Sequence, residues 1–583
     1  MAEALLIPAA NVILSRLLPL ATNQINLAWG FKEDLEKLRK RLEIIQGLLE
    51  IGGSEESKIL VTTHSREVVQ ALQDLQSCTH ELTELSKEDC WTMFRNKVFA
   101  NGGPRETQTL LDIGRRMVEK CKGVPLAINI LGGLLYSKQN EQDWESIEKS
   151  ELWSSPKSKD RILIVLRLSF GHLSSPSLKQ SFAYCSIFPK DHVISKDELI
   201  QLWMGLGYLQ PSSKSKLEME ELGNEYFNTL WLNLLFQEVE FDEYNNITSC
   251  KMHDLVHDLA LHVSQGTCLT LEASEVKKNP DVLHLCLFLR EEKQLDILKE
   301  NVEKLRTLFL MGHLPQHTKD FKSICALRLA KFGVEEESCS ISKSIHLRFL
   351  DLNEENYYDL EDVENYYDLE DEDNHHDRRK LMPMKIGKLT SLQTLPFFVV
   401  GKKSGHRIEE LGSLSKLSGK LHVYDLQHVK DKEEAKKAKI LEKSGIQELK
   451  LHWHRDLGDS EMSNNNHEDV LEGLKPHRNI KGLILINFEG RRLPPWMSTN
   501  ARLLQNLVKI ELEGCISCEQ VPALGHLPHL ATIVMKGLHN LKHIGPIFYG
   551  LDEGIVGSCS SSGVATARVF PALRKFKLFD MPH

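Results

Sequence analysis

The sequence has no uninterrupted run of about 18 apolar residues, which is the minimum for a helix that crosses a membrane. We therefore expect no transmembrane segment. The first twenty residues are apolar, but they lack a basic start, and Pro8, Asn11, Arg16 and Pro19 interrupt them. We therefore do not interpret this stretch as a signal peptide.

The sequence also lacks the string Gly-x-x-x-x-Gly-Lys-Ser/Thr, in which backbone amides and a lysine hold nucleotide phosphates. It has no apolar strand ending in paired aspartates, which would bind Mg²⁺. No motif sets a general base beside a nucleophile. We predict that the chain is not an enzyme, with no catalytic residue and no metal site.

The 12 cysteines are scattered over 583 residues and lack the spacing of a disulfide framework. This favours reduced thiols, so we expect a cytoplasmic protein, with the nucleus or the face of the plasma membrane as further locations. The net charge is −10, and residues 353–373 hold eleven Asp or Glu and no Lys or Arg. The remaining charges nearly balance, so no nucleic-acid partner is expected.

A chain of this length predicts several domains. Residues 1–50 contain a helical stripe, which we interpret as one helix of a bundle because two and a half heptads do not define a free coiled coil. Residues 51–80 begin with a polar loop, followed by a buried strand at 58–63 and a helix at 66–75. The apolar stripe consists of Phe31, Leu35, Leu38, Leu42, Ile45 and Leu49.

Residues 81–155 predict a small helical bundle, and residues 156–275 predict helices followed by a hairpin, which is the order of a winged helix. The bundle helices are expected at 86–99, 110–120 and 125–135, and the later helices at 162–173, 178–188, 196–208 and 254–263. The hairpin is expected at 234–241 and 247–252. Ser195 predicts an N-cap, with Glu198 as its capping-box partner. The helix at 196–208 carries Trp203, so we predict that it is buried and does not read DNA.

Two short motifs lie at helix starts. Gly123 and Pro125 form a tight turn before a helix, which on its own predicts only a helix start. His253 stands where the hairpin ends and a helix begins, a place suited to a phosphate group. The alternative is a capping or core histidine, which is the commoner role for a lone histidine.

From residue 280 to residue 583 the pattern Leu-x-x-Leu-x-Leu recurs, often at 19 to 28 residues, and predicts a leucine-rich-repeat solenoid. Side chains such as Lys509 and Glu511 are expected on its concave side. Cys515 and Cys518 lack a second ligand pair at zinc spacing, so we interpret them as structural. The repeats begin at Leu305, Ile324, Leu347, Leu392, Ile446, Ile480, Leu507, Leu530 and Leu573, with one more marked by Leu421 and Val423.

Residues 353–377 interrupt the repeats with an acidic insert that contains an internal duplication. We interpret it as a solvated loop. The alternative is a docking site for a basic partner, or loose cation binding.

Three strings in fixed order resemble plant coiled-coil NB-ARC leucine-rich-repeat disease resistance proteins. They are Gly123-Val-Pro-Leu-Ala127, the stretch from Leu178 to Asp191, and Lys251-Met-His-Asp-Leu255. The resemblance implies an α/β multidomain protein. Its parts are truncated Rx-type coiled-coil helices (1–50), a remnant of the P-loop-type nucleotide-binding subdomain (51–80), an ARC1 helical bundle (81–155), an ARC2 winged helix (156–275) and leucine-rich repeats (280–583).

The resemblance also implies ADP or ATP as the ligand. Gly123 and Pro125 would contact the adenine and ribose, and His253 would contact the β-phosphate of ADP. His64 stands where the family has a phosphate-sensing arginine. Because the phosphate-loop string is missing, we expect nucleotide binding to be weak or absent.

The implied function is an intracellular immune receptor. Its repeats would bind a pathogen effector or a guarded host protein, and its N-terminal arm would self-associate. One alternative is a scaffold or decoy that binds a partner without switching, and another is an active ATPase, which the missing motifs disfavour.

Overall fold

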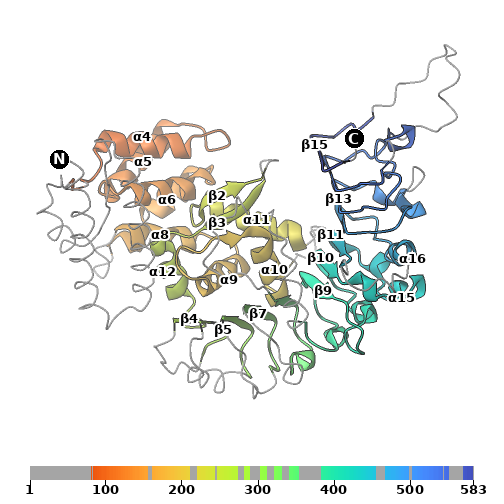
Figure 1. Ribbon diagram of the computed structural model, residues 1–583. Coiled ribbons are helices and arrows are strands. Elements are labelled where there is room, and N and C mark those ends of the chain that lie inside the picture. Colours follow the sequence, from red (N-terminus) through yellow and green to blue (C-terminus); the bar gives the residue numbers. More distant parts are fainter. Residues whose placement is uncertain are drawn as a thin grey trace, which may run out of the picture. The chain divides into compact units, whose positions relative to one another are not determined.

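The computed structural model describes residues 80–581 except 82, 155–160, 211–218, 243–245, 273–280, 289–302, 312–320, 331–339, 353–381, 455–465, 498–501, 542–543 and 550–568. The arm at 1–50, the strand at 58–63, His64 and the acidic insert 353–377 lie outside these residues. The chain divides into two compact units, Met1–Val165 with Leu271–Val276, and Leu166–Thr270 with Lys277–His583. Each unit is described separately (Figure 1).

The described part of the first unit is a bundle of helices α4 (Lys87–Val98), α5 (Gln108–Lys120), α6 (Pro125–Tyr136) and α7 (Glu141–Glu148), followed by the 3-10 turn η2 (Glu151–Ser154). The side chains of Ser86, Thr107 and Asn140 cap α4, α5 and α7. Phe94 and Trp144 meet edge to face in the core, with ring centroids 6.1 Å apart. The three predicted helices are confirmed to within about two residues, and α7 is additional.

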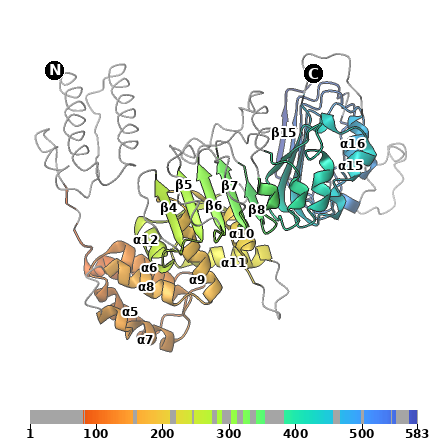
Figure 2. The ribbon, with the colours of Figure 1, turned by 90° about the horizontal axis from the view of Figure 1, so that it is seen from below.

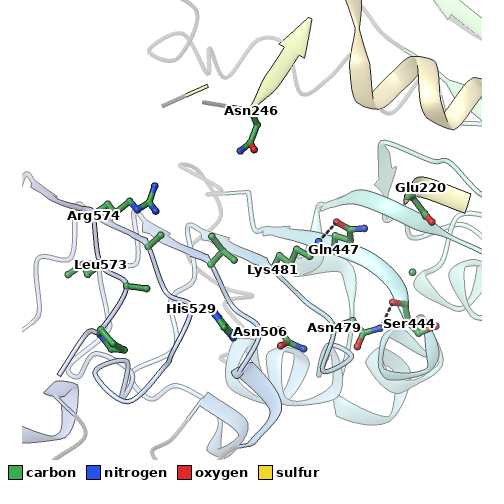
Figure 3. Close-up of a pocket in the computed structure, with 15 residues that line it drawn as sticks. Glu220, Asn246, Ser444, Gln447, Asn479, Lys481, Asn506, His529, Leu573 and Arg574 are labelled. Carbon is green, nitrogen blue, oxygen red and sulfur yellow. Dashed lines mark hydrogen bonds between the residues drawn. The ribbon is translucent and has the colours of Figure 1, made fainter. Parts of the chain in front are cut away.

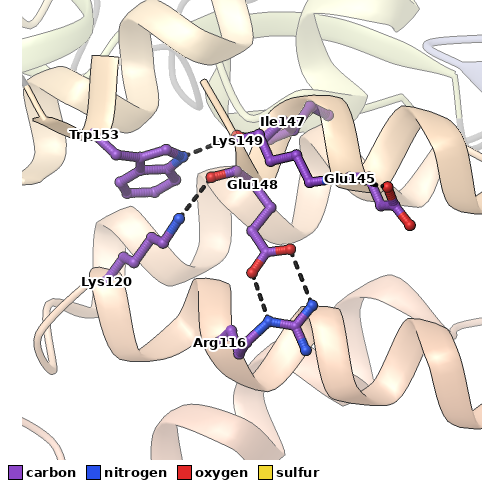
Figure 4. Close-up of polar contacts among 7 residues, drawn as sticks. All are labelled: Arg116, Lys120, Glu145, Ile147, Glu148, Lys149 and Trp153. Carbon is purple, nitrogen blue, oxygen red and sulfur yellow. Dashed lines mark hydrogen bonds and ion pairs between the residues drawn. The ribbon is translucent and has the colours of Figure 1, made fainter. Parts of the chain in front are cut away.

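Polar contacts tie α5 to the end of α7 (Figure 4). Arg116 donates two hydrogen bonds to the Glu148 carboxylate, at 2.6 and 3.0 Å. Lys120 Nζ donates to the backbone oxygen of Glu148 at 2.6 Å, and Trp153 Nε1 donates to that of Ile147 at 2.9 Å. Lys120 and Trp153 thus satisfy carbonyls that the last turn of a helix leaves without intrahelical partners.

Helix α8 (Arg161–Gly171) spans the division, and the second unit continues with a winged helix. This consists of α9 (Pro176–Tyr184), η3 (Cys185–Ile187), β1 (Ile194–Ser195), α10 (Lys196–Leu206), α11 (Met219–Leu232), β2 (Gln237–Phe241), β3 (Ile247–Lys251) and α12 (Asp254–Val263). The three strands form an antiparallel sheet in the order β1-β3-β2.

Helix α10 is buried, as its apolar sequence predicted. Trp203 is 0% exposed, and its indole N–H donates to the backbone oxygen of Ser181 at 3.1 Å. The expected capping box is wrong. Ser195 is the N-cap, as predicted, but makes no side-chain capping bond, and the Glu198 side chain forms an ion pair with Arg328.

The repeats form two sheets, in the orders β4-β5-β6-β7-β8 and β15-β14-β13-β12-β11-β10-β9 (Figure 2). An isolated parallel bridge between Phe349 and Thr394 links them. Strands β5 to β8, and β9 to β15, pair in parallel with their neighbours. The strands are β4 (Cys268–Glu272), β5 (His284–Phe288), β6 (Thr307–Met311), β7 (Ala326–Ala330), β8 (Phe349–Asp351), β9 (Phe397–Val399), β10 (Ser418–Tyr424), β11 (Gly445–His452), β12 (Gly482–Ile486), β13 (Lys509–Glu513), β14 (Thr532–Lys536) and β15 (Lys575–Phe579).

Equivalent leucine-type residues stand in register from repeat to repeat. Leu449 pairs with Leu483, Leu483 with Ile510, and Ile510 with Ile533, and all four are 0% exposed. Each repeat buries its apolar face against its neighbours, which is the stabilising principle of a solenoid. Every predicted repeat start lies within about two residues of a strand or of the bridge at Thr394, whereas β4 and β5 were not predicted.

Candidate functional site

The turn before α6 is shaped by Gly123 and Pro125. Gly123 has φ +75°, a left-handed conformation that glycine adopts without strain. A Cβ atom there would lie 2.7 Å from Glu84 Cβ and 3.0 Å from the Leu85 backbone oxygen, so a larger residue would not fit. Pro125 is the first residue of α6 and is exposed. The turn is therefore rigid, with the proline ring at the surface.

His253 is the N-cap of α12. Its Nδ1 atom accepts a hydrogen bond from the backbone N–H of Leu255 at 3.2 Å. An accepting Nδ1 leaves the proton of a neutral imidazole on Nε2. Because the side chain is exposed, this N–H can donate outward, beside the positive end of the α12 dipole. The structure therefore gives His253 the capping role that was the alternative interpretation.

His257, one turn later, has a structural role. It is 7% exposed, and its Nε2 atom lies 2.8 Å from the backbone oxygen of Phe188. This bond ties α12 to the end of η3. Gly123 and Pro125 belong to the first unit and His253 to the second. Within the described residues, no cluster of three or more His, Cys, Asp or Glu could hold a metal ion.

Sequence reasoning missed the interface between the winged helix and the first repeats. Side chains at alternate positions of β5 to β8 share the face opposite the buried leucines. Phe309 on this face meets Phe188 after η3, with ring centroids 5.8 Å apart. We call this contact, together with the bonds described next, the winged-helix–repeat interface.

A buried hydrogen-bond chain crosses this interface. Tyr208 Oη lies 3.0 Å from His284 Nε2, and His284 Nδ1 lies 2.9 Å from Thr307 Oγ1. His284 is 4% exposed, and burial, aided by the charge of Arg306, lowers its pKa to about 3. The imidazole is therefore neutral at physiological pH.

Arg328 on β7 is the ionic centre of the interface. Its guanidinium pairs with Glu198 of α10 and, at 2.8 Å, with Asp351 of β8. It also stands over the Phe309 ring, 4.8 Å from the centroid. Burial raises the pKa of Glu198, and the charge of Arg328 acts in the opposite direction. The sequence does contain one sign of this interface, because Arg328 is a charged residue between Leu327 and Leu329 in an otherwise apolar strand.

Two more arginines hold the C-terminal end of α10. Arg306 donates to the backbone oxygen of Leu206 at 3.0 Å, and Arg348 donates to that of Gly205 at 3.3 Å. Cations at this end stabilise the helix dipole and satisfy its last carbonyls. The winged helix thus packs on the face of these first repeats that lies opposite the buried leucines.

Cys515 and Cys518 are buried, and their thiols face backbone oxygens. Cys515 Sγ lies 3.6 Å from the oxygen of Glu513, and Cys518 Sγ lies 3.4 Å from that of Gly490. These contacts fit the structural role that the sequence predicted.

Comparison with known protein families finds matches to three domain families. The disease resistance protein winged helix domain matches residues 187–260, the NB-ARC domain matches 42–103, and the R13L1/DRL21 leucine-rich repeats match 408–538. These three matches give the domain set of the NB-ARC leucine-rich-repeat class of plant disease resistance proteins, to which the chain is similar, as the resemblance predicted.

Individual relatives carry the same description. Disease resistance protein RGA2 of Solanum bulbocastanum is 34% identical over 547 residues, which cover 92% of this chain and 54% of that protein. Disease resistance protein RPP13 of Arabidopsis thaliana is 30% identical over 381 residues, covering 63% of this chain and 41% of that protein. The chain spans about half the length of these curated relatives. Among the described helices, none is both long and apolar enough to cross a membrane.

Proposed function

We propose that this protein acts in plant defence as an immune-receptor-like protein, with its repeats binding a pathogen effector or a host protein altered by one. The observation that supports this most is the winged-helix–repeat interface. It occupies the face of β5 to β8 opposite the buried leucines, and we place the partner site among the later repeats, β9 to β15. These repeats follow in the same unit as α10.

The proposed role of nucleotide binding in this protein is more limited than that of partner binding. Pro125 and His253, which are both exposed, are the proposed contacts for ADP or ATP, with Gly123 shaping the turn. The phosphate-loop string is absent from the 583 residues, and His64 is a weaker cation than arginine. A ligand shifts a conformational equilibrium only if it binds the two states differently. We infer that nucleotide does not drive a switch in this chain and that it does not hydrolyse ATP.

Disruption of the gene in its source plant tests the role in defence. We expect pathogen growth to rise for at least one isolate of a diverse panel, and a wild-type transgene to restore resistance. Unchanged growth across the whole panel would contradict a role in recognition.

The substitution His253→Val tests whether a switch operates. Expressed in leaf tissue, the variant is expected to cause no more ion leakage than the wild-type chain, because no grip on the phosphates remains to be released. Matched expression levels and the control His262→Val, an exposed histidine on the same helix, make the comparison fair. A defence response specific to His253→Val would instead indicate a working nucleotide switch. Its absence favours the second candidate, a binding scaffold or decoy.

A further inference from the structure

A groove runs along the edge of the solenoid where strands β11 to β15 begin (Figure 3). Its volume is about 1020 Å³, and it lies wholly within the second unit. Polar side chains predominate in its lining, with Lys481 and Arg574 as its lysine and arginine and Glu220 as its carboxylate. Glu220 of α11 and Asn246 before β3 add two winged-helix residues to the lining, and the nucleotide motifs lie elsewhere.

The floor of the groove is periodic. Lys481, Val508, Ala531 and Arg574 each stand directly before equivalent paired residues of β12, β13, β14 and β15. Neighbouring strands lie about 4.8 Å apart, so three strand steps separate the backbones of Lys481 and Arg574 by roughly 14 Å. Two cations thus flank two small apolar side chains.

The backbone along this floor is already hydrogen-bonded. The oxygen of Lys481 accepts from the N–H groups of Val508 and Lys509, and that of Val508 accepts from those of Ala531 and Thr532. The N–H of Arg574 donates to the oxygen of Ala531. An incoming chain therefore cannot add as a further strand. Recognition at this edge must use side chains.

The side chains offer charge and amide groups. Lys481 is exposed, and its Nζ atom donates to the neutral Gln447 amide oxygen at 3.1 Å. Asn479 and Asn506 each donate an amide N–H to the preceding turn, at 3.1 Å from the oxygens of Ser444 and Arg478. Each amide oxygen remains able to accept a bond from a ligand N–H. Outside the groove lining, Lys509 and Lys536 pair with Glu511 and Glu513.

We propose that this groove binds an extended acidic segment of a partner protein, with two carboxylates four residues apart. An extended chain rises about 3.4 Å per residue, so four residues span the separation of the two cations. Small aliphatic residues between the carboxylates pack on Val508 and Ala531. The proposal rests on the proposed function only in taking the partner to be a protein.

Fluorescence anisotropy with the purified full chain tests the proposal. The probe is a labelled peptide with the core Glu-Ala-Val-Ala-Glu, and the control peptide has Gln in place of both Glu residues. We expect a dissociation constant below about 1 mM for the acidic peptide, at least five-fold weaker binding of the control, and weakening with salt. Equal affinity for the two peptides, or no binding at millimolar concentration, would overturn the proposal.

Variants locate the site. Lys481→Gln and Arg574→Gln are each expected to weaken binding about two- to five-fold, as the loss of one exposed ion pair predicts. Lys536→Gln, which removes a lysine that does not line the groove, is the matched control and should bind as the wild type does. The double variant Lys481→Glu/Arg574→Glu should instead prefer the peptide Lys-Ala-Val-Ala-Lys. Equal loss in Lys536→Gln, or no change of preference in the double variant, would place any binding elsewhere. The infection experiment can succeed or fail independently of this result.

Discussion

The substitution Arg328→Leu is expected to destabilise the second unit by roughly 3 kcal/mol, because it leaves the carboxylates of Glu198 and Asp351 without their common cation. Arg328 has a 6% exposed side chain, so water cannot replace it fully. The loss should be largest at the winged-helix–repeat interface. Hydrogen exchange should therefore accelerate in α10 before it does in β12 to β14.

Two control variants test whether the loss of protection comes from the broken ion pairs of Arg328. Arg95→Leu breaks an exposed arginine–glutamate pair in the first unit and should leave exchange in α10 unchanged. Arg328→Leu with Glu198→Gln removes one orphaned charge and should recover part of the lost protection. If Arg328→Leu leaves exchange in α10 at the wild-type rate, the ionic centre does not hold the helix.

The stability of the second unit is expected to fall as the pH drops below about 6.5, partly because of His284. Its pKa is lowered to about 3 in the folded protein, whereas an exposed histidine titrates near 6.5. Below 6.5 the unfolded chain therefore binds a proton that the folded chain does not. Linkage then predicts a loss of about 2 kcal/mol between pH 7 and pH 5 from this residue.

The measurement compares urea midpoints at pH 7 and pH 5 for the wild type and His284→Gln. The variant loses stability at both values because the Tyr208–His284–Thr307 chain is broken. However, its further loss between the two values should be smaller than that of the wild type by about 2 kcal/mol. His262→Gln, on the exposed side of α12, should keep the wild-type dependence. An unchanged pH dependence in His284→Gln would show that the buried imidazole is not the source.

Periodicity and local motifs predicted the elements well. Some features depend only on residues that are near one another in the chain, so they can be predicted from the sequence. They are the apolar helix faces around Phe94 and Trp203 and the spacing of the repeat leucines. Strands β4 and β5 were missed because the repeat pattern becomes regular only from Leu305.

The interface could not be predicted, because its partners lie far apart in sequence. Glu198 fitted a capping box with Ser195, yet its partner Arg328 is 130 residues away. Tyr208 and His284 are separated by 76 residues. A rule based on neighbouring residues assigns Glu198 to the nearby Ser195. Only the packing of α10 on the repeats shows that Arg328 is its partner. The roles of Gly123, Pro125 and His253 in nucleotide binding remain predictions.

The most direct test of the account is calorimetric titration of the purified full chain with ADP. Without the phosphate-loop string, the contacts of Pro125 and His253 are expected to give no binding tighter than about 1 mM, with or without Mg²⁺. Denaturing the fresh protein should likewise release no stoichiometric adenine nucleotide. Micromolar or tighter binding of ADP, or recovery of one nucleotide per chain, would contradict the account.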